Sequence, residues 1–183
     1  MSAASLALGA FVAASLLLVV SGVAKWRTPS PTVPVLRALG HAATPRSVRL
    51  LACAEILIGG SALVGLAGTF SSTVTQATAT ALAFAYFALA VVAAKLLSDG
   101  TGGDCGCFGT SWAPVTGLHV VVNLAAGLSA AIVVAQPASV RALVSADPST
   151  AALVASVVAL TAATRLVLSD SAALAALVRE GER

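Results

Sequence analysis

The sequence predicts an all-α, polytopic membrane helix bundle of about five transmembrane helices, forming a single domain over residues 1–183. Of its 183 residues, 58% are hydrophobic and only 9% are charged, and the mean hydropathy is +1.00. Soluble domains carry about 25% charged residues. Five apolar stretches are close to the ~20 residues that a helix needs to cross the hydrocarbon core. Because lipid offers the backbone no hydrogen bonds, these stretches are expected to be helical.

The predicted spans lie at about 2–24, 47–68, 76–97, 117–135 and 150–168. The first has no Lys or Arg ahead of its apolar run and is longer than a signal-peptide core, so we expect it to be retained in the membrane. Proline fits the first turn of a helix, and Thr or Asp can cap it. Three X-Pro pairs mark helix starts: Thr44-Pro45, Ala113-Pro114 and Asp147-Pro148. In the first and third of them, the residue before proline can also cap the helix. Residues 169–183 are expected to form an amphipathic tail.

The connection between the first two spans, residues 25–46, is long and rich in proline. Its apolar residues predict one or two helical turns on the membrane surface, with Arg37 facing water. These residues are Val33, Val35, Leu36 and Leu39.

The basic residues predict the topology. With five spans, nine of the ten Lys and Arg residues fall on the side that holds residues 25–46, the cysteine-containing loop after the third span and the C-terminus; only Arg141 falls on the other. The positive-inside rule therefore favours the cytoplasm for the cysteine-containing loop. Trp26 and Trp112 fit an aromatic belt on the same side. The basic residues are dispersed and aromatic residues are few, so we expect contact with membrane lipid and no nucleic-acid binding.

The loop from Ser98 to Pro114 contains the string Asp104-Cys105-Gly106-Cys107-Phe108-Gly109, with five glycines between positions 100 and 109. A disulfide across a single residue is strained, and strained, exposed disulfides are the more oxidising and labile ones. We therefore favour redox chemistry for Cys105 and Cys107. A reduced, idle thiol pair and a metal clip are the alternatives.

The two thiols are expected to differ in role. Cys107 lies nearer to the N-terminus of the next span, whose dipole favours a thiolate, whereas Cys105 follows the negative Asp104. Cys107 is thus predicted to attack and Cys105 to resolve. We expect the apolar side chains of Phe108 and Trp112 to hold the loop over the bundle, near the basic residues Lys25, Lys95 and His119.

His119 opens the fourth span and admits three interpretations. It could orient or deprotonate a loop thiol, serve as a third metal ligand with Cys105 and Cys107, or have no functional role. Zinc sites usually have four ligands at wider spacing. We therefore predict no metal site and keep these three residues as the alternative.

Glu55 lies inside the second span, roughly two turns from the cysteine side. Ionisable groups in membrane helices are costly and face a partner or a cavity, and Lys25 and Lys95 are at comparable depth. Glu55 shares a helix face with the small residues Gly59 and Ala62, where helices pack closely. The predicted ion pair either fixes helix register or has a functional role.

Three further residues are candidates within the spans. Asn123 and Tyr86 are predicted to form hydrogen bonds between helices. Cys53 lies roughly 200° around the helix from Glu55. It is interpreted either as a small apolar residue or as a third redox thiol.

These residues resemble the MauE/DoxX-like membrane proteins, especially the methylamine-utilisation protein MauE family. The resemblance covers most of the chain and rests on Ser21-Gly22-Val23-Ala24-Lys25, Glu55 with Gly59, the Cys105–Gly109 string and Asn123. It implies a small, redox-associated helical bundle with a thioredoxin-like partner, linked to maturation of disulfide-containing proteins outside the cytoplasm. The resemblance therefore favours the exported side for the loop, against the charge count.

We therefore expect a membrane thiol–disulfide redox protein, a candidate oxidoreductase, in the bacterial cytoplasmic membrane. It would exchange electrons with a thioredoxin-like partner, with no bound cofactor predicted and a quinone as the candidate electron acceptor. Two alternatives use the same loop. One is a non-catalytic assembly factor, and the other is a carrier that passes copper or mercury from Cys105 and Cys107 towards Glu55 or Cys53.

Overall fold

The computed structural model describes residues 3–66, 72–99 and 115–136, together with Thr161. The helices in chain order are α1 (Ala3–Arg27), α2 (Thr32–Ala38), α3 (Pro45–Leu66), α4 (Ser72–Ser98) and α5 (Gly117–Ala135). Within these residues, all of the helices except α2 are long and apolar enough to cross a membrane, and no strand is present. The prediction of an all-α, polytopic bundle is confirmed.

The observed boundaries differ from the predicted spans by a few residues. Helix α1 continues past residue 24 to Arg27 and so includes Lys25, and α4 begins at Ser72 instead of 76. Helix α5 covers 117–135, as predicted. Of the predicted fifth span, only Thr161 is described, and it is helical and buried. The cysteine loop and the tail lie outside the described residues.

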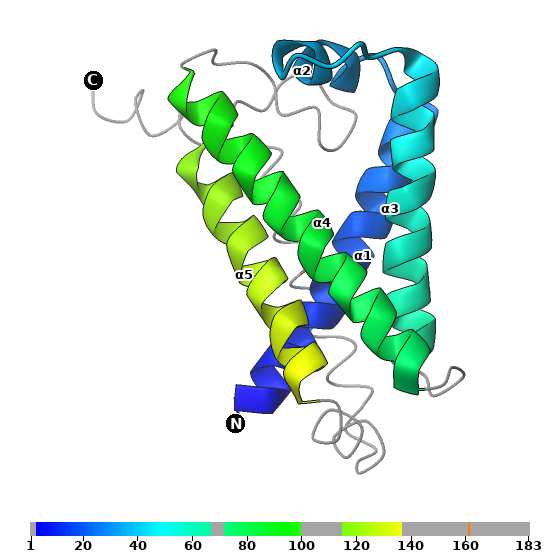
Figure 1. Cartoon of the computed structure of the whole chain (residues 1–183), viewed down its shortest axis with the longest axis vertical. Helices are drawn as coiled ribbons and strands as arrows, with labels where there is room; N and C mark the ends of the chain where they lie inside the picture. Colours follow the sequence, from blue (N-terminus) through cyan, green and yellow to red (C-terminus); the bar gives the residue numbers. More distant parts are fainter. Residues whose placement is uncertain (1–2, 67–71, 100–114, 137–160, 162–183) are drawn as a thin grey trace, which may run out of the picture.

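The four long helices run side by side, each antiparallel to the next along the chain (Figure 1). Contacts between α1 and α3, α3 and α4, α4 and α5, and α5 and α1 close them into a ring. Helix α2 lies across one end of this ring. The C-terminal ends of α1 and α4 and the N-terminal ends of α3 and α5 lie at that end, which we call the α2 end (Figure 1).

The residues facing the core of α1 and α3 recur alternately three and four positions apart. Such spacing keeps one side of a helix against its neighbours. In α1 the buried series is Phe11, Ala14, Leu18, Ser21 and Lys25. In α3 it is Val48, Ala52, Glu55, Gly59 and Ala62.

Tyr86 links helices that are not neighbours in the ring. Its hydroxyl, buried on α4, donates a hydrogen bond to the carbonyl oxygen of Ala14 on α1 at 2.6 Å. The bond gives the buried hydroxyl a partner and joins the two helices across the core. The predicted interhelical hydrogen bond of Tyr86 is confirmed.

Glycines bring the backbones of α1 and α3 into close contact. A Cβ atom added at Gly22 would lie 2.8 Å from the carbonyl oxygen of Ala52, and one at Gly59 would lie 2.6 Å from that of Ser15. No side chain fits at either distance without moving a backbone. The predicted close packing along the face of Glu55, Gly59 and Ala62 is confirmed.

Helix α2 forms the predicted short helix in the connection between α1 and α3. Val33 and Leu36 pack against Ala43 and Val48 in a small cluster at the start of α3. Arg37 is exposed, as predicted, while its Nε donates to the carbonyl oxygen of Ala43 at 3.1 Å.

Thr44 caps α3, as its position before Pro45 predicts. The Ser47 N–H donates to the Thr44 hydroxyl at 3.2 Å, and the Thr44 N–H donates to the Ser47 hydroxyl at 2.9 Å. These reciprocal bonds satisfy backbone donors that a helix start otherwise leaves free.

We expect Gly59→Ala to lower the thermal unfolding temperature of the purified protein, because its methyl group would meet the Ser15 carbonyl oxygen. Overpacking of this kind costs about 1–3 kcal/mol. Gly60→Ala is the matched control, since nothing lies within 4 Å of the added Cβ, and alanine favours helix by about 1 kcal/mol. Equal melting temperatures for the two variants would contradict the close approach of α1 and α3.

Candidate functional site

A buried ion pair joins α1 to α3 near the α2 end. The Lys25 Nζ lies 2.6 Å from Glu55 Oε1 and 2.8 Å from Oε2. Only 3% of Lys25 and 4% of Glu55 is exposed. The predicted ion pair of Glu55 is confirmed, with Lys25 as the partner.

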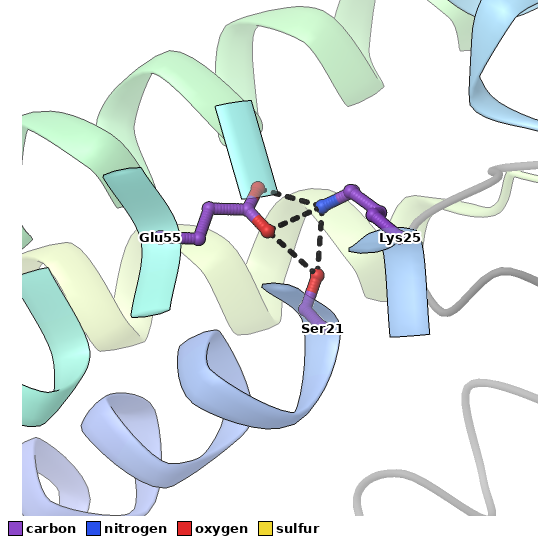
Figure 2. A network of polar contacts seen from close by, with 3 residues as sticks. All are labelled: Ser21, Lys25 and Glu55. Atoms are coloured by element: carbon purple, nitrogen blue, oxygen red, sulfur yellow. Dashed lines mark hydrogen bonds and ion pairs between the residues drawn. The ribbon is translucent and has the colours of Figure 1, made fainter. Parts of the chain in front are cut away.

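Ser21 completes the pair into a closed triangle (Figure 2). Its hydroxyl accepts a hydrogen bond from Lys25 Nζ at 2.7 Å and donates one to Glu55 Oε2 at 3.3 Å. An ammonium has three N–H donors and no acceptor. Lys25 therefore finds one acceptor for each donor: the two carboxylate oxygens and the hydroxyl.

This role of Ser21 was not predicted from the sequence, in which Ser21 stands only as part of the string from Ser21 to Lys25. The available signal was its position four residues before Lys25, which places both side chains on one face of α1. The same spacing continues the core-facing series of α1, so a polar residue there needs a polar partner.

The geometry of the triangle fits an ammonium paired with a carboxylate, which together carry no net charge. Removing two charges from water is expensive, and their attraction offsets this only where the remaining polar atoms are also bonded. Here the hydroxyl supplies the missing bond. In the interior of a membrane bundle, this arrangement is the least costly way to keep both ionisable groups.

Gly22 sets the separation across which the pair forms. A Cβ atom at this position would lie 3.2 Å from Glu55 Cβ and 2.8 Å from a side-chain carbon of Ile56. Without a side chain at Gly22, α3 can lie close enough for Glu55 to reach Ser21 and Lys25 directly. The string Ser21-Gly22-Val23-Ala24-Lys25 thus supplies hydroxyl, close contact and ammonium from about one and a half turns of one helix.

Lys95, the other predicted partner of Glu55, is exposed near the C-terminal end of α4. It takes no part in the buried pair. Its position at the α2 end instead adds a positive charge to the surface there.

His119 is buried in the first turn of α5, where it caps the helix. The Thr116 N–H donates to His119 Nδ1 at 3.2 Å, and the Thr116 hydroxyl lies 3.0 Å from the same nitrogen. Because Nδ1 accepts from a backbone N–H, the imidazole proton belongs on Nε2. His119 thus takes the place that Glu or Gln occupies in a capping box.

Two other predicted site residues, Cys53 and Asn123, lie outside the triangle of Ser21, Lys25 and Glu55. Cys53 is a free, half-buried thiol on α3, and Asn123 is half-buried on α5 without a side-chain hydrogen bond to the described residues. The ranges that the structure describes contain no group of three His, Cys, Asp or Glu side chains suited to a metal. Cys105, Cys107, Phe108 and Trp112 lie outside the described residues.

Removing one member of the ion pair is expected to destabilise the bundle more than removing both. Glu55→Ala leaves a buried ammonium unpaired and should cost about 3–5 kcal/mol, whereas Lys25→Met with Glu55→Met should recover most of that loss. Glu55→Gln should be milder than Glu55→Ala, because it keeps a hydrogen-bond acceptor. Thermal unfolding in detergent measures these differences, with exposed Lys95→Met as the control; additive single effects would contradict a direct pair.

The capping role of His119 predicts that His119→Gln keeps the stability of the wild type, since glutamine also offers an acceptor at this position. His119→Ala should lose about 1 kcal/mol. Unfolding temperature tests this order. The rate of thiol exchange, measured on the same variants, tests the competing role: a loss of exchange in His119→Gln would mean that the imidazole acts on a loop thiol.

Residues 1–136 match the family model of the methylamine utilisation protein MauE. This range includes the buried triangle, all described helices and the cysteine loop. Comparison with curated proteins and with solved structures gives no match. The match covers well over half of the chain, and four helices of spanning length accompany it: the chain belongs to the MauE family and is a multi-pass membrane protein.

Proposed function

We propose that the protein is a membrane thiol–disulfide redox protein that exchanges electrons with a thioredoxin-like partner through Cys105 and Cys107, and so supports maturation of other proteins. The Cys107 thiolate attacks a disulfide sulfur of the partner, which forms a mixed disulfide and releases one partner thiolate. The Cys105 thiolate then attacks Cys107 Sγ, and the second partner thiolate leaves. The partner gains the two electrons that the loop loses.

The reverse sequence oxidises the partner. A partner dithiol then reduces the Cys105–Cys107 disulfide and leaves with a disulfide of its own. A quinone in the bilayer would restore the loop disulfide by taking up two electrons and two protons. In either direction, the chain itself supplies only the two thiols and their surroundings.

The observation that carries this proposal is the position of the helix ends that flank the Cys-Gly-Cys string. Helix α4 ends at Ser98 and α5 begins at Gly117. The two helices pack against each other, and both of these ends lie at the α2 end (Figure 1). The chain between them therefore starts and finishes at the α2 end, where His119 lies in the first turn of α5.

The charges at the α2 end also favour thiolate chemistry. Among the residues that the structure describes, the exposed charged side chains are Arg27, Arg37, Arg46, Arg49, Lys95 and Asp99. Five of these six are cations, and cations near a thiol favour its reactive thiolate form.

Single-cysteine variants test the proposal. With purified thioredoxin as the probe, Cys105→Ser should accumulate a mixed disulfide through Cys107, and Cys107→Ser should accumulate less. Mass spectrometry of non-reduced peptides should link Cys105 to Cys107 in the oxidised wild type. Cys53→Ser is the matched control, because Cys53 is a half-buried thiol on α3, and it should exchange normally.

Two outcomes would replace the redox function. Copper or mercury that copurifies in stoichiometric amount and is lost from both loop variants would favour a soft-metal carrier. Loop thiols that can be replaced without any loss of partner maturation would favour a non-catalytic assembly factor.

The side of the membrane is tested separately. The cationic α2 end favours the cytoplasmic side under the positive-inside rule, whereas the family resemblance favours the exported side. A membrane-impermeant thiol reagent added to intact cells labels the loop only if it is exported, and the Cys105→Ser/Cys107→Ser variant gives the background.

A further inference from the structure

We propose that the arginines around α2 and the exposed leucines of α3 form a binding site for an anionic phospholipid. The arginines belong to three neighbouring elements: Arg27 ends α1, Arg37 lies on α2, and Arg46 and Arg49 lie in the first turns of α3. All four side chains are exposed. The loop thiols themselves take no part in this site.

Among the described residues, none of these arginines forms an ion pair with an acidic side chain, and Asp99 alone adds an exposed negative charge at the α2 end. Residues 1–54 contain no Asp or Glu, and Glu55 is buried and already paired with Lys25. Like charges placed together repel one another and attract an anion from outside the chain. Each arginine near a membrane surface adds about 1 kcal/mol of attraction to anionic lipid.

The apolar residues below the arginines distinguish a lipid from a free anion. Arg46, Leu50 and Leu57 lie within about 40° of one another around α3, because they are four and eleven residues apart. Leu50 is 72% exposed and Leu57 is 70% exposed. A guanidinium at the membrane surface is thus continued by an apolar column on the outer face of the bundle.

The length of this column fits one leaflet. Eleven residues of helix rise about 16 Å from Arg46 to Leu57, roughly half of the ~30 Å hydrocarbon core. A phospholipid with its phosphate at Arg46 and an acyl chain along the two leucines would satisfy both features. Trp26, 48% exposed beside Arg27, is of the residue type that prefers the headgroup level.

The test uses the delipidated full chain in detergent and phosphatidylglycerol as the probe, with bound lipid counted by native mass spectrometry. We expect phosphatidylglycerol to bind more tightly than phosphatidylcholine. Arg46→Gln should weaken its binding about fivefold, and Arg46→Lys, which keeps the charge, should weaken it less. Lys95→Gln is the charge-matched control, because Lys95 is also exposed at the α2 end, and it should change binding less than twofold.

Four results would overturn the proposal. The first is equal binding of the two lipids, and the second is an equal loss in Arg46→Gln and Lys95→Gln. The third is inorganic phosphate raising the unfolding temperature as much as phosphatidylglycerol does, which would assign the site to a free anion. The fourth is displacement of the lipid by a polyglutamate peptide, which would assign the surface to an acidic protein.

Unfolding temperatures without lipid establish that each variant is folded, and the Cys105→Ser/Cys107→Ser variant should bind lipid as the wild type does.

Discussion

The need to keep Lys25 and Glu55 paired inside an apolar bundle constrains much of the structure. Neither charge can be left alone among lipid-facing helices, because an unpaired buried ion costs several kcal/mol. The pair therefore fixes both the rotation of α1 and α3 and their relative height. Ser21 reinforces this by bonding to both partners, so a shift of one turn along either helix would break the three hydrogen bonds that join α1 to Glu55. The triangle thus selects one register from the many that small, apolar helix faces would accept.

That register depends in turn on how closely the helices approach. Membrane helices gain little from burying apolar surface against one another, so contact and hydrogen bonding stabilise the pairs. Gly22 and Gly59 remove the side chains that would separate α1 from α3. On the other side of the ring, Gly127 allows the Phe87 ring to lie against the backbone of α5. Tyr86 then ties α4 back to α1 across the core. Close packing at small residues and a few buried hydrogen bonds therefore stabilise the contacts among the four helices.

All charged side chains of the described residues lie towards one end of the bundle. They are Lys25, Arg27, Arg37, Arg46, Arg49, Glu55, Lys95 and Asp99. One membrane surface of the protein is thus strongly cationic, while the described part of the opposite end is uncharged. The chain between α4 and α5, the capping histidine and helix α2 are all attached to the cationic end. A reactive loop and a lipid contact, as proposed here, would share this cationic surface, and its arginines would act in both.

The sequence alone determined the features that depend on composition and local spacing. Apolar runs of spanning length predicted the long helices, Thr44 before Pro45 predicted the cap of α3, and a lone acidic residue in a span predicted a buried partner. Family resemblance followed from local strings such as Ser21–Lys25. Only the tertiary structure decided that Lys25, and not Lys95, pairs with Glu55. Both lysines lie at a similar depth, but depth does not fix which side of a helix faces which neighbour. The same reason kept two other roles hidden. The Ser21 hydroxyl bridges the ion pair because α3 lies against it, and the His119 imidazole caps its own helix by accepting from the Thr116 N–H.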